Sequence, residues 1–282
     1  MNRKIAQKIV FTLLRLLTFS VIGLVVFIFG FVLWKGLGKI SWTFLTAMPA
    51  NGMTEGGIFP AIVGTCLLVI GSSLFAFPVG LIAGIYMSEY AKDGFIKKFI
   101  RLMTNNLAGV PSVVFGLFGL SLFVNIMGLG VSAWAGSLTL GLMILPLIIR
   151  TTEESLQFVD KNLRLASYAL GAGKLRTILN IVLPAAAPNI LTGFIIAIGR
   201  VAGETAPIIF TAAVYFIPTV SFSFWQPVMA LPYHLYVTST SGIDLEKSRE
   251  LAFGTAFVLI TIVLILNIIA SLIRQTLSKN LK

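Results

Sequence analysis

Long apolar runs, separated by short segments that hold nearly all of the charge, dominate the chain. A helix needs about 20 apolar residues to cross the hydrocarbon core of a bilayer. Such runs predict transmembrane helices at Leu16–Trp34, within Gly56–Ser88, over Ala187–Val214 and over Leu251–Ile273. The uncharged stretch Leu102–Ile149 has room for two more, which would turn near Gly128–Gly130 and end at Pro146–Arg150. We therefore predict an all-α polytopic membrane protein with about six transmembrane helices.

The first apolar run follows four basic residues, as the apolar part of a secretory signal peptide would. It is longer than such a segment, and no small-residue cleavage site follows it. We expect it to remain in the protein as the first transmembrane helix.

Composition supports the membrane interpretation, because 57% of the 282 residues are hydrophobic and only 11% are charged. The net charge of +11 does not indicate nucleic-acid binding, since the basic residues form no tract or recognition motif. With the N-terminus inside, sixteen of the 21 Lys and Arg residues fall in inner segments, four fall in outer ones and Arg200 lies within a span. Basic residues favour cytoplasmic loops. We therefore predict a multi-pass protein of the plasma (inner) membrane with both termini in the cytoplasm.

One cysteine and one histidine are too few to form a metal site from Cys and His ligands. We expect Cys66 to be a buried small apolar residue and His234 to lie in a loop or at the membrane interface. No metal site and no catalytic residue is predicted, which disfavours a membrane-embedded enzyme.

The longest inner loop, Arg150–Ala187, has the spacing of a helix over Glu153–Leu170. Gly171 and Gly173 interrupt it, and a second short helix is expected to end near Pro184. Such a helix–turn–helix could rest on the lipid surface or dock into a groove of a soluble partner, and spacing alone favours the lipid. The stretch Gly171–Lys174 is no phosphate-binding loop, because Tyr168 and Leu175 stand where that motif needs Gly and Ser or Thr.

Two opposite charges lie inside the fifth predicted span. Arg200 and Glu204 are four residues apart and would share one helix face. Gly199 and Gly203 permit close helix packing, and Pro207 would kink the helix. The charges could neutralise each other as a structural pair, or Arg200 could offer its planar donors to a passing oxyanion while Glu204 holds it. The rarity of charges inside membranes favours the functional interpretation.

The inner loop resembles the EAA loop of type I ABC-importer permeases. Gly171, nine intervening residues and Ile181-x-Leu183-Pro184 match that pattern, while Leu165-Ala166-Ser167 stands where the family has Glu-Ala-Ala and only the middle residue agrees. The resemblance implies that Leu165–Gly173 is a coupling helix that docks on a separate ATPase subunit. ATP would then be bound by that partner, and this chain would need no cofactor.

Three further stretches resemble phosphate-importer permeases of the PstA and PstC type, and the length and short first outer loop resemble the PstA type more. They are Gly199–Pro207, which reads Gly-Arg-x-x-Gly-Glu-Thr-Ala-Pro, together with Asn106–Gly119 and Leu145–Glu154. The resemblance implies phosphate as cargo, a second permease subunit, an ATPase dimer and an extracytoplasmic binding protein. It makes Arg150, Arg200 and Glu204 candidates for the translocation path. Arg150 has an alternative role as an ordinary basic anchor at a helix end.

The expected organisation has three parts. Residues 1–56 form an N-terminal segment, first transmembrane helix and outer loop; residues 57–275 form the type I importer domain, with its coupling loop at about 150–187; residues 276–282 form a tail.

Two other functions fit the sequence pattern. One is the same architecture with another oxyanion, such as sulfate or molybdate, as cargo. The other is a secondary transporter or channel, which would leave the segment from Gly171 to Pro184 unexplained.

Overall fold

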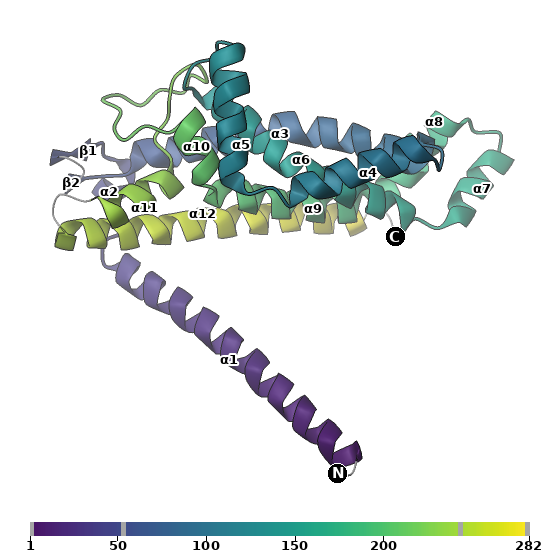
Figure 1. Ribbon diagram of the computed structural model, residues 1–282, viewed down its shortest axis with the longest axis horizontal. Helices are drawn as coiled ribbons and strands as arrows, with labels where there is room; N and C mark the ends of the chain where they lie inside the picture. The colour runs from purple at the N-terminus through teal and green to yellow at the C-terminus, as the bar shows by residue number, and fades with distance from the viewer. Residues whose placement is uncertain (1–2, 52–54, 242–244, 280–282) are drawn as a thin grey trace.

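A computed structural model of the chain describes residues 3–51, 55–241 and 245–279, and its helices form an elongated bundle (Figure 1). The outermost part of the predicted tail, residues 280–282, lies outside the described residues. The elements, in chain order, are α1 (Arg3–Leu37), α2 (Trp42–Thr46), β1 (Pro49–Ala50), β2 (Glu55–Gly56), α3 (Phe59–Ile85), π-helical η2 (Tyr86–Tyr90), α4 (Phe95–Ala108), α5 (Ser112–Gly119), π-helical η3 (Leu120–Ile126), α6 (Ala133–Gln157), α7 (Lys161–Ala169), α8 (Lys174–Thr177), π-helical η4 (Ile178–Val182), α9 (Leu183–Gly203), α10 (Ala206–Thr211), α11 (Leu231–Thr240) and α12 (Leu245–Lys279).

The described residues contain 5 helices long and apolar enough to cross a membrane, or 6 if one bent pair is counted as a single span. The all-α polytopic fold and the number of about six spans are therefore confirmed. The spans are Gln7–Leu37, Phe59–Tyr90, Ala133–Gln157, Lys174–Gly203 and Glu246–Thr276, and the bent pair is Phe95–Ala108 with Ser112–Ile126.

The bent pair corrects the expectation that Leu102–Ile149 holds two ordinary spans. The helix axes of α4 and α5 differ in direction by 102°, and Figure 1 shows α5 crossing the direction of α3, α6 and α12. Pro111 precedes the first turn of α5 and has no N–H with which to continue α4, so the helix breaks there. The predicted turn is confirmed, since Gly128 and Gly130 have φ values of 68° and 64°.

Helices α3, α6, α9 and α12 lie side by side and carry most of the core (Figure 1). Glycines allow α3 and α6 to approach closely. A Cβ atom on Gly80 would lie 2.6 Å from Ile148 Cγ2, and one on Gly84 would lie 2.5 Å from Thr152 Cβ. Larger side chains at either glycine would clash, so these two helices pack as one unit.

Helix α1 leaves the bundle at an angle (Figure 1), and none of its most apolar part is buried. It contacts the bundle only near its C-terminal end, where the Phe31 and Phe253 rings meet edge to face at 5.8 Å. Nearly the whole apolar length of this helix is therefore available to lipid or to another chain.

Two predicted helix ends are wrong. Helix α6 passes through Pro146 and continues to Gln157, because a proline in the middle of a buried helix is tolerated when neighbouring helices support the freed carbonyl. The helix expected at Glu153–Leu170 is thus split between α6 and α7. The second short helix does not end near Pro184, since η4 runs on into α9 and Pro184 lies in the first turn of α9.

The expectation of a buried Cys66 and the alternative of a loop position for His234 are also wrong. Cys66 is exposed on α3. His234 lies within α11 with 3% of its surface exposed. Its Nδ1 is 3.1 Å from the Thr255 hydroxyl, and burial lowers the pKa of His234 to about 4, so the imidazole is neutral.

Candidate functional site

The first part of the candidate site is a helical hairpin formed by α7 and α8. Asp160 caps α7 by accepting a 2.9 Å hydrogen bond from Asn162 N–H. The Ser167 and Thr177 hydroxyls are hydrogen-bonded at 2.8 Å in a buried contact that joins the two arms. Gly171 forms the turn with φ of 79°, a left-handed conformation that glycine adopts without strain. The break predicted at Gly171 and Gly173 is therefore confirmed.

Several large apolar side chains of this hairpin are exposed beside its basic residues. Leu170 at the turn has 89% of its surface exposed, and Leu165 and Leu175 are each 62% exposed. Ala166 is exposed as well, whereas Ser167 faces inward. A group of exposed leucines on an ordered hairpin is a candidate contact surface.

Replacing Gly171 by alanine is expected to destabilise the hairpin by about 1–2 kcal/mol, the cost of a left-handed conformation for an L-residue. A Cβ atom there would meet nothing within 4 Å, so the cost is conformational and not steric. Thermal unfolding of the purified protein in detergent should show a Tm lower by roughly 2–4 °C. Gly173 is the matched control, because its φ is −70° and a Cβ atom there would also meet nothing. An equal loss in Gly173→Ala would contradict this explanation.

The second part of the candidate site is the charged pair on α9. Arg200 Nε donates to Glu204 Oε1 at 3.3 Å, and the side chains are 43% and 18% exposed. Glu204 is not on the helix, because α9 ends at Gly203 and Glu204 has extended dihedrals of −76° and 129°. Pro207 lacks the N–H that would bond to the Gly203 carbonyl. The predicted kink is therefore a break at Glu204–Thr205, before the short helix α10.

The depth of this pair follows from the packing of α9 against α12. Arg274, the first charged residue after the apolar run of α12, donates to the Thr192 hydroxyl at 2.9 Å and marks one edge of that run. Arg200 lies eight residues further along α9, which is about 12 Å at 1.5 Å per residue. The hydrocarbon core is about 30 Å thick. If Arg274 marks the edge of the hydrocarbon core, Arg200 lies close to its middle.

The two glycines beside Arg200 do not mediate close packing within the described residues. A Cβ atom on Gly199 would lie 3.7 Å from Asn267 Oδ1, an ordinary contact, and one on Gly203 would meet nothing. The close approach of α9 occurs instead at Gly193, where a Cβ atom would be 2.4 Å from the Thr151 hydroxyl of α6. The buried Asn267 Oδ1 has no hydrogen-bond partner within the described residues. Sequence reasoning missed this asparagine, although a single Asn in an apolar run is a signal.

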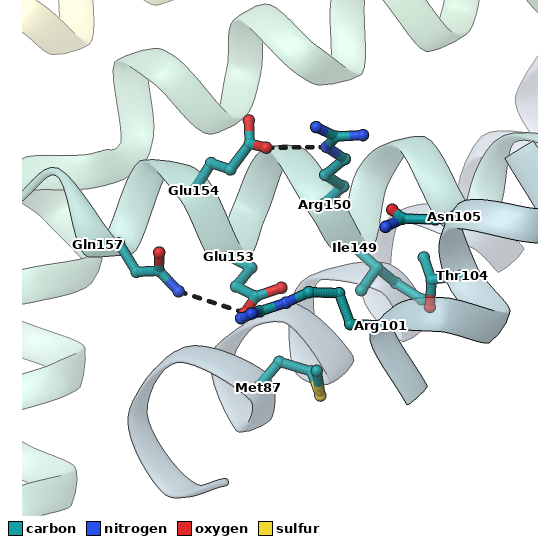
Figure 2. Close-up of a pocket in the computed structure, with 9 residues that line it drawn as sticks. All are labelled: Met87, Arg101, Thr104, Asn105, Ile149, Arg150, Glu153, Glu154 and Gln157. Atoms are coloured by element: carbon teal, nitrogen blue, oxygen red, sulfur yellow. Dashed lines mark hydrogen bonds and ion pairs between the residues drawn. The ribbon is translucent and has the colours of Figure 1, made fainter. Parts of the chain in front are cut away.

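The third part surrounds Arg150 on α6. Arg150 Nε donates to Glu154 Oε1 at 2.8 Å, and both side chains are more than half exposed. They border a cavity of about 260 Å³ between α4 and α6 (Figure 2). Figure 2 shows Arg101 reaching across from α4 to Glu153, whose side chain is only 8% exposed and also accepts from Gln157. Sequence reasoning missed Arg101 and Glu153, since their contact spans 52 residues of sequence.

Arg150 and Arg200 lie on neighbouring antiparallel helices. The Ser132 N–H bonds to the Thr211 carbonyl at one end of α6, and Gly193 meets Thr151 near the other. Arg200 is seven residues beyond Gly193, so the two arginines differ in depth by about 10 Å. Because the helices are antiparallel, the charges follow the order Glu204, Arg200, Arg150, Glu154 along the membrane normal. The two cations thus lie between the two carboxylates.

These features define a polytopic helical membrane protein with an Arg–Glu pair inside a predicted span and a hairpin that exposes apolar side chains. Residues 76–282 match the family described as binding-protein-dependent transport system inner membrane component. The chain belongs to this family, and the expected type I importer architecture is confirmed.

Curated relatives of similar length support this assignment. The chain is 31% identical over 293 residues to the probable ABC transporter permease protein YqgI of Bacillus subtilis (strain 168), covering 100% of this chain and 99% of that protein. It is 36% identical over 245 residues to the phosphate transport system permease protein PstA of Yersinia pestis, covering 85% and 80%. For PstA of Pasteurella multocida (strain Pm70) the identity is 34% over 278 residues, covering 98% and 97%.

Solved structures share the fold at low sequence identity. A bacterial ABC transporter involved in the import of the acidic polysaccharide alginate matches with a TM-score of 0.69 at 16% identity, covering 95% of this chain and 96% of that chain. The MetNI methionine ABC transporter, in an inward-facing conformation, matches with a TM-score of 0.61 at 16% identity, covering 78% and 97%.

Proposed function

We propose that this chain is one of two permease subunits of an ATP-driven phosphate importer. The relatives named phosphate transport system permease protein PstA support phosphate as the cargo. The observation that carries the proposal is Arg200, paired with Glu204 near the middle of the membrane and still 43% exposed. A charge at that depth is retained only at a considerable energetic cost, and such residues mark ion paths.

The translocation path is assigned to Arg200, Glu204 and Arg150. Among the described residues, the hydrogen bond of each pair joins the glutamate to Nε of the arginine. The two terminal nitrogens can therefore serve as a donor fork for an oxyanion. The neighbouring carboxylate weakens the attraction, and phosphate can therefore leave. No covalent chemistry is required of this chain, which acts as a transport subunit and not as an enzyme.

The ATPase contact is assigned to the hairpin, from Leu165, Ala166 and Ser167 through Gly171 and Gly173. Leu165 and Leu170 expose an apolar surface to the partner, whereas Ser167 secures the fold of the hairpin. ATP binding and dimer closure in the partner would move the hairpin, and the helices would then alternate between inward-open and outward-open states. ATP is bound by the partner, and this chain needs no cofactor.

The wider assembly follows from the same assignment. Both termini face the cytoplasm of the inner (plasma) membrane, as the distribution of basic residues indicates. A second permease subunit packs beside this chain, an ATPase dimer binds the hairpins, and an extracytoplasmic binding protein delivers phosphate. Residues 57–275 form the transport domain, preceded by the segment 1–56 and followed by the tail 276–282.

Reconstitution tests this function directly. The complex of this chain with its second permease subunit, ATPase and binding protein is expected to hydrolyse ATP faster when phosphate is added, because loaded binding protein favours the state in which the ATPase closes. Sulfate is the matched control and should not stimulate. Stimulation by sulfate without stimulation by phosphate would overturn the choice of cargo, and phosphate uptake without any ATPase would indicate a secondary transporter.

A further inference from the structure

The inner end of α3 holds a buried acidic residue that the translocation path does not use. Glu89 lies in η2, and its side chain is only 8% exposed. Its Oε1 accepts a 2.7 Å hydrogen bond from Arg164 Nη2 of α7, a residue 75 positions away in sequence. The Arg164 side chain is itself only 16% exposed. An ion pair removed from water to this degree is sensitive to the loss of either partner, because the remaining charge would be buried alone.

Arg164 joins the ends of two membrane helices to the hairpin. Besides Glu89, its guanidinium donates to the Leu156 carbonyl at 2.7 Å and to the Val159 carbonyl at 2.8 Å. The Leu156 carbonyl lies in the last turn of α6, where main-chain oxygens lack partners within the helix, and the Val159 carbonyl lies two residues beyond the end of α6. One side chain of α7 therefore holds both the end of α3 and the end of α6.

The other arm of the hairpin returns to the same place. Lys174 of α8 donates to the main-chain carbonyl of Glu89, and its Nζ lies 4.6 Å from the centre of the Tyr90 ring. A cation at the end of a helix is favoured by the helix dipole, and the ring face adds to the attraction. Both arms of the hairpin are thus anchored on Glu89, and the α8 arm also contacts Tyr90.

Movement of this anchor must reach the helix that carries Arg150. Gly84 is five residues before Glu89 on the same continuous helix, and it packs against Thr152 of α6 with no room for a Cβ atom. Thr152 is two residues from Arg150. Close-packed interiors transmit displacement because they have little free volume.

We propose that Glu89 is a positioning residue that anchors the hairpin to α3 and α6, so that a displacement of the hairpin is carried to Arg150 and opens or closes the path. This rests on the proposed function, since it requires an ATPase partner and a transported anion. Glu89 touches neither. Its role is to couple the movement of the hairpin to the movement of the helix that carries Arg150.

The test measures phosphate transported per ATP hydrolysed, in proteoliposomes holding the complete complex with its binding protein. Among the complexes that assemble, Glu89→Gln and Arg164→Gln are expected to retain basal ATPase activity, while this ratio falls about tenfold. Glu250→Gln is the matched control, because Glu250 also pairs with a distant cation, Lys39, at 3.0 Å. That pair is more exposed and joins no part of the hairpin, so the ratio should not change.

A covalent link separates coupling from stability. With Cys66, the only native cysteine, replaced by serine, Glu89→Cys and Arg164→Cys can be bridged by a short bifunctional thiol reagent. Without reagent, the variant with both cysteines should have lost the normal ratio of phosphate transported to ATP hydrolysed. Bridging the two cysteines should restore that ratio. A proportional loss of transport and ATPase activity in Glu89→Gln, an unchanged ratio, or no recovery on bridging would overturn the proposal. If the wild-type complex shows no phosphate-stimulated ATPase activity, the proposed function is overturned as well. The wild-type measurement comes first, so this failure is distinguished from a failure of the Glu89 proposal.

Discussion

Replacing Arg200 by alanine is expected to lower phosphate uptake by the assembled complex between about 10- and 100-fold. Charge-assisted hydrogen bonds contribute about 1.5–3 kcal/mol each, and every 1.4 kcal/mol is a factor of ten. Arg200→Lys keeps the charge but loses the planar fork, so uptake should fall less. Initial rates of radiolabelled phosphate uptake, with co-purification of all subunits as the measure of assembly, provide the readout.

The double variant decides between a functional pair and a structural one. Arg200→Ala leaves Glu204, with only 18% of its side chain exposed, without its cation, and that alone could disturb assembly. Replacing both residues by alanine removes the unpaired charge. Assembly should then recover while uptake stays low. Recovery of both assembly and uptake would show that the pair only stabilises the protein and that Arg200 does not handle phosphate.

Hydropathy was sufficient to predict the transmembrane spans, because the bilayer imposes a length and an apolar surface on each helix that crosses it. It could not place the break between α4 and α5, since Pro111 lies within an apolar run and proline is common in straight membrane helices as well. The same ambiguity explains Pro146 and Pro184, which were expected to end helices and instead lie inside continuous ones. Whether a proline breaks a helix depends on the neighbours that satisfy the freed carbonyl, and periodicity does not describe those neighbours.

Local pairs were predictable and distant ones were not. Arg200 and Glu204 are four residues apart, so helical geometry alone suggested their contact, and the structure places them 3.3 Å apart. The pairs Arg164–Glu89 and Arg101–Glu153 connect different helices. In the sequence each of these residues looks like an ordinary charge at a membrane boundary. Their partners depend on how the helices pack, which the sequence pattern of one segment does not contain.

The apolar tip of the hairpin should decide whether the ATPase binds. Leu170→Asp is expected to weaken binding of the ATPase at least tenfold, because loss of an apolar anchor at the centre of an interface costs about 2 kcal/mol or more. Leu170 is 89% exposed, so the change removes almost no contact within this chain. The fold and membrane insertion should be retained. The fraction of ATPase that co-purifies with the permease subunits in detergent measures the effect.

Met127→Asp is the matched control for that change. Met127 is a 54% exposed apolar residue beside the turn that precedes α6, at the opposite end of this helix from the hairpin. Met127→Asp should not alter ATPase binding.

The competing interpretation of the hairpin, a helix that rests on lipid, predicts that Leu170→Asp leaves co-purification of the ATPase unchanged and only weakens attachment to the bilayer surface. Leu165, which is 62% exposed, suits an apolar contact with a protein groove. An added Leu165→Ala change should therefore deepen the loss of ATPase binding in Leu170→Asp.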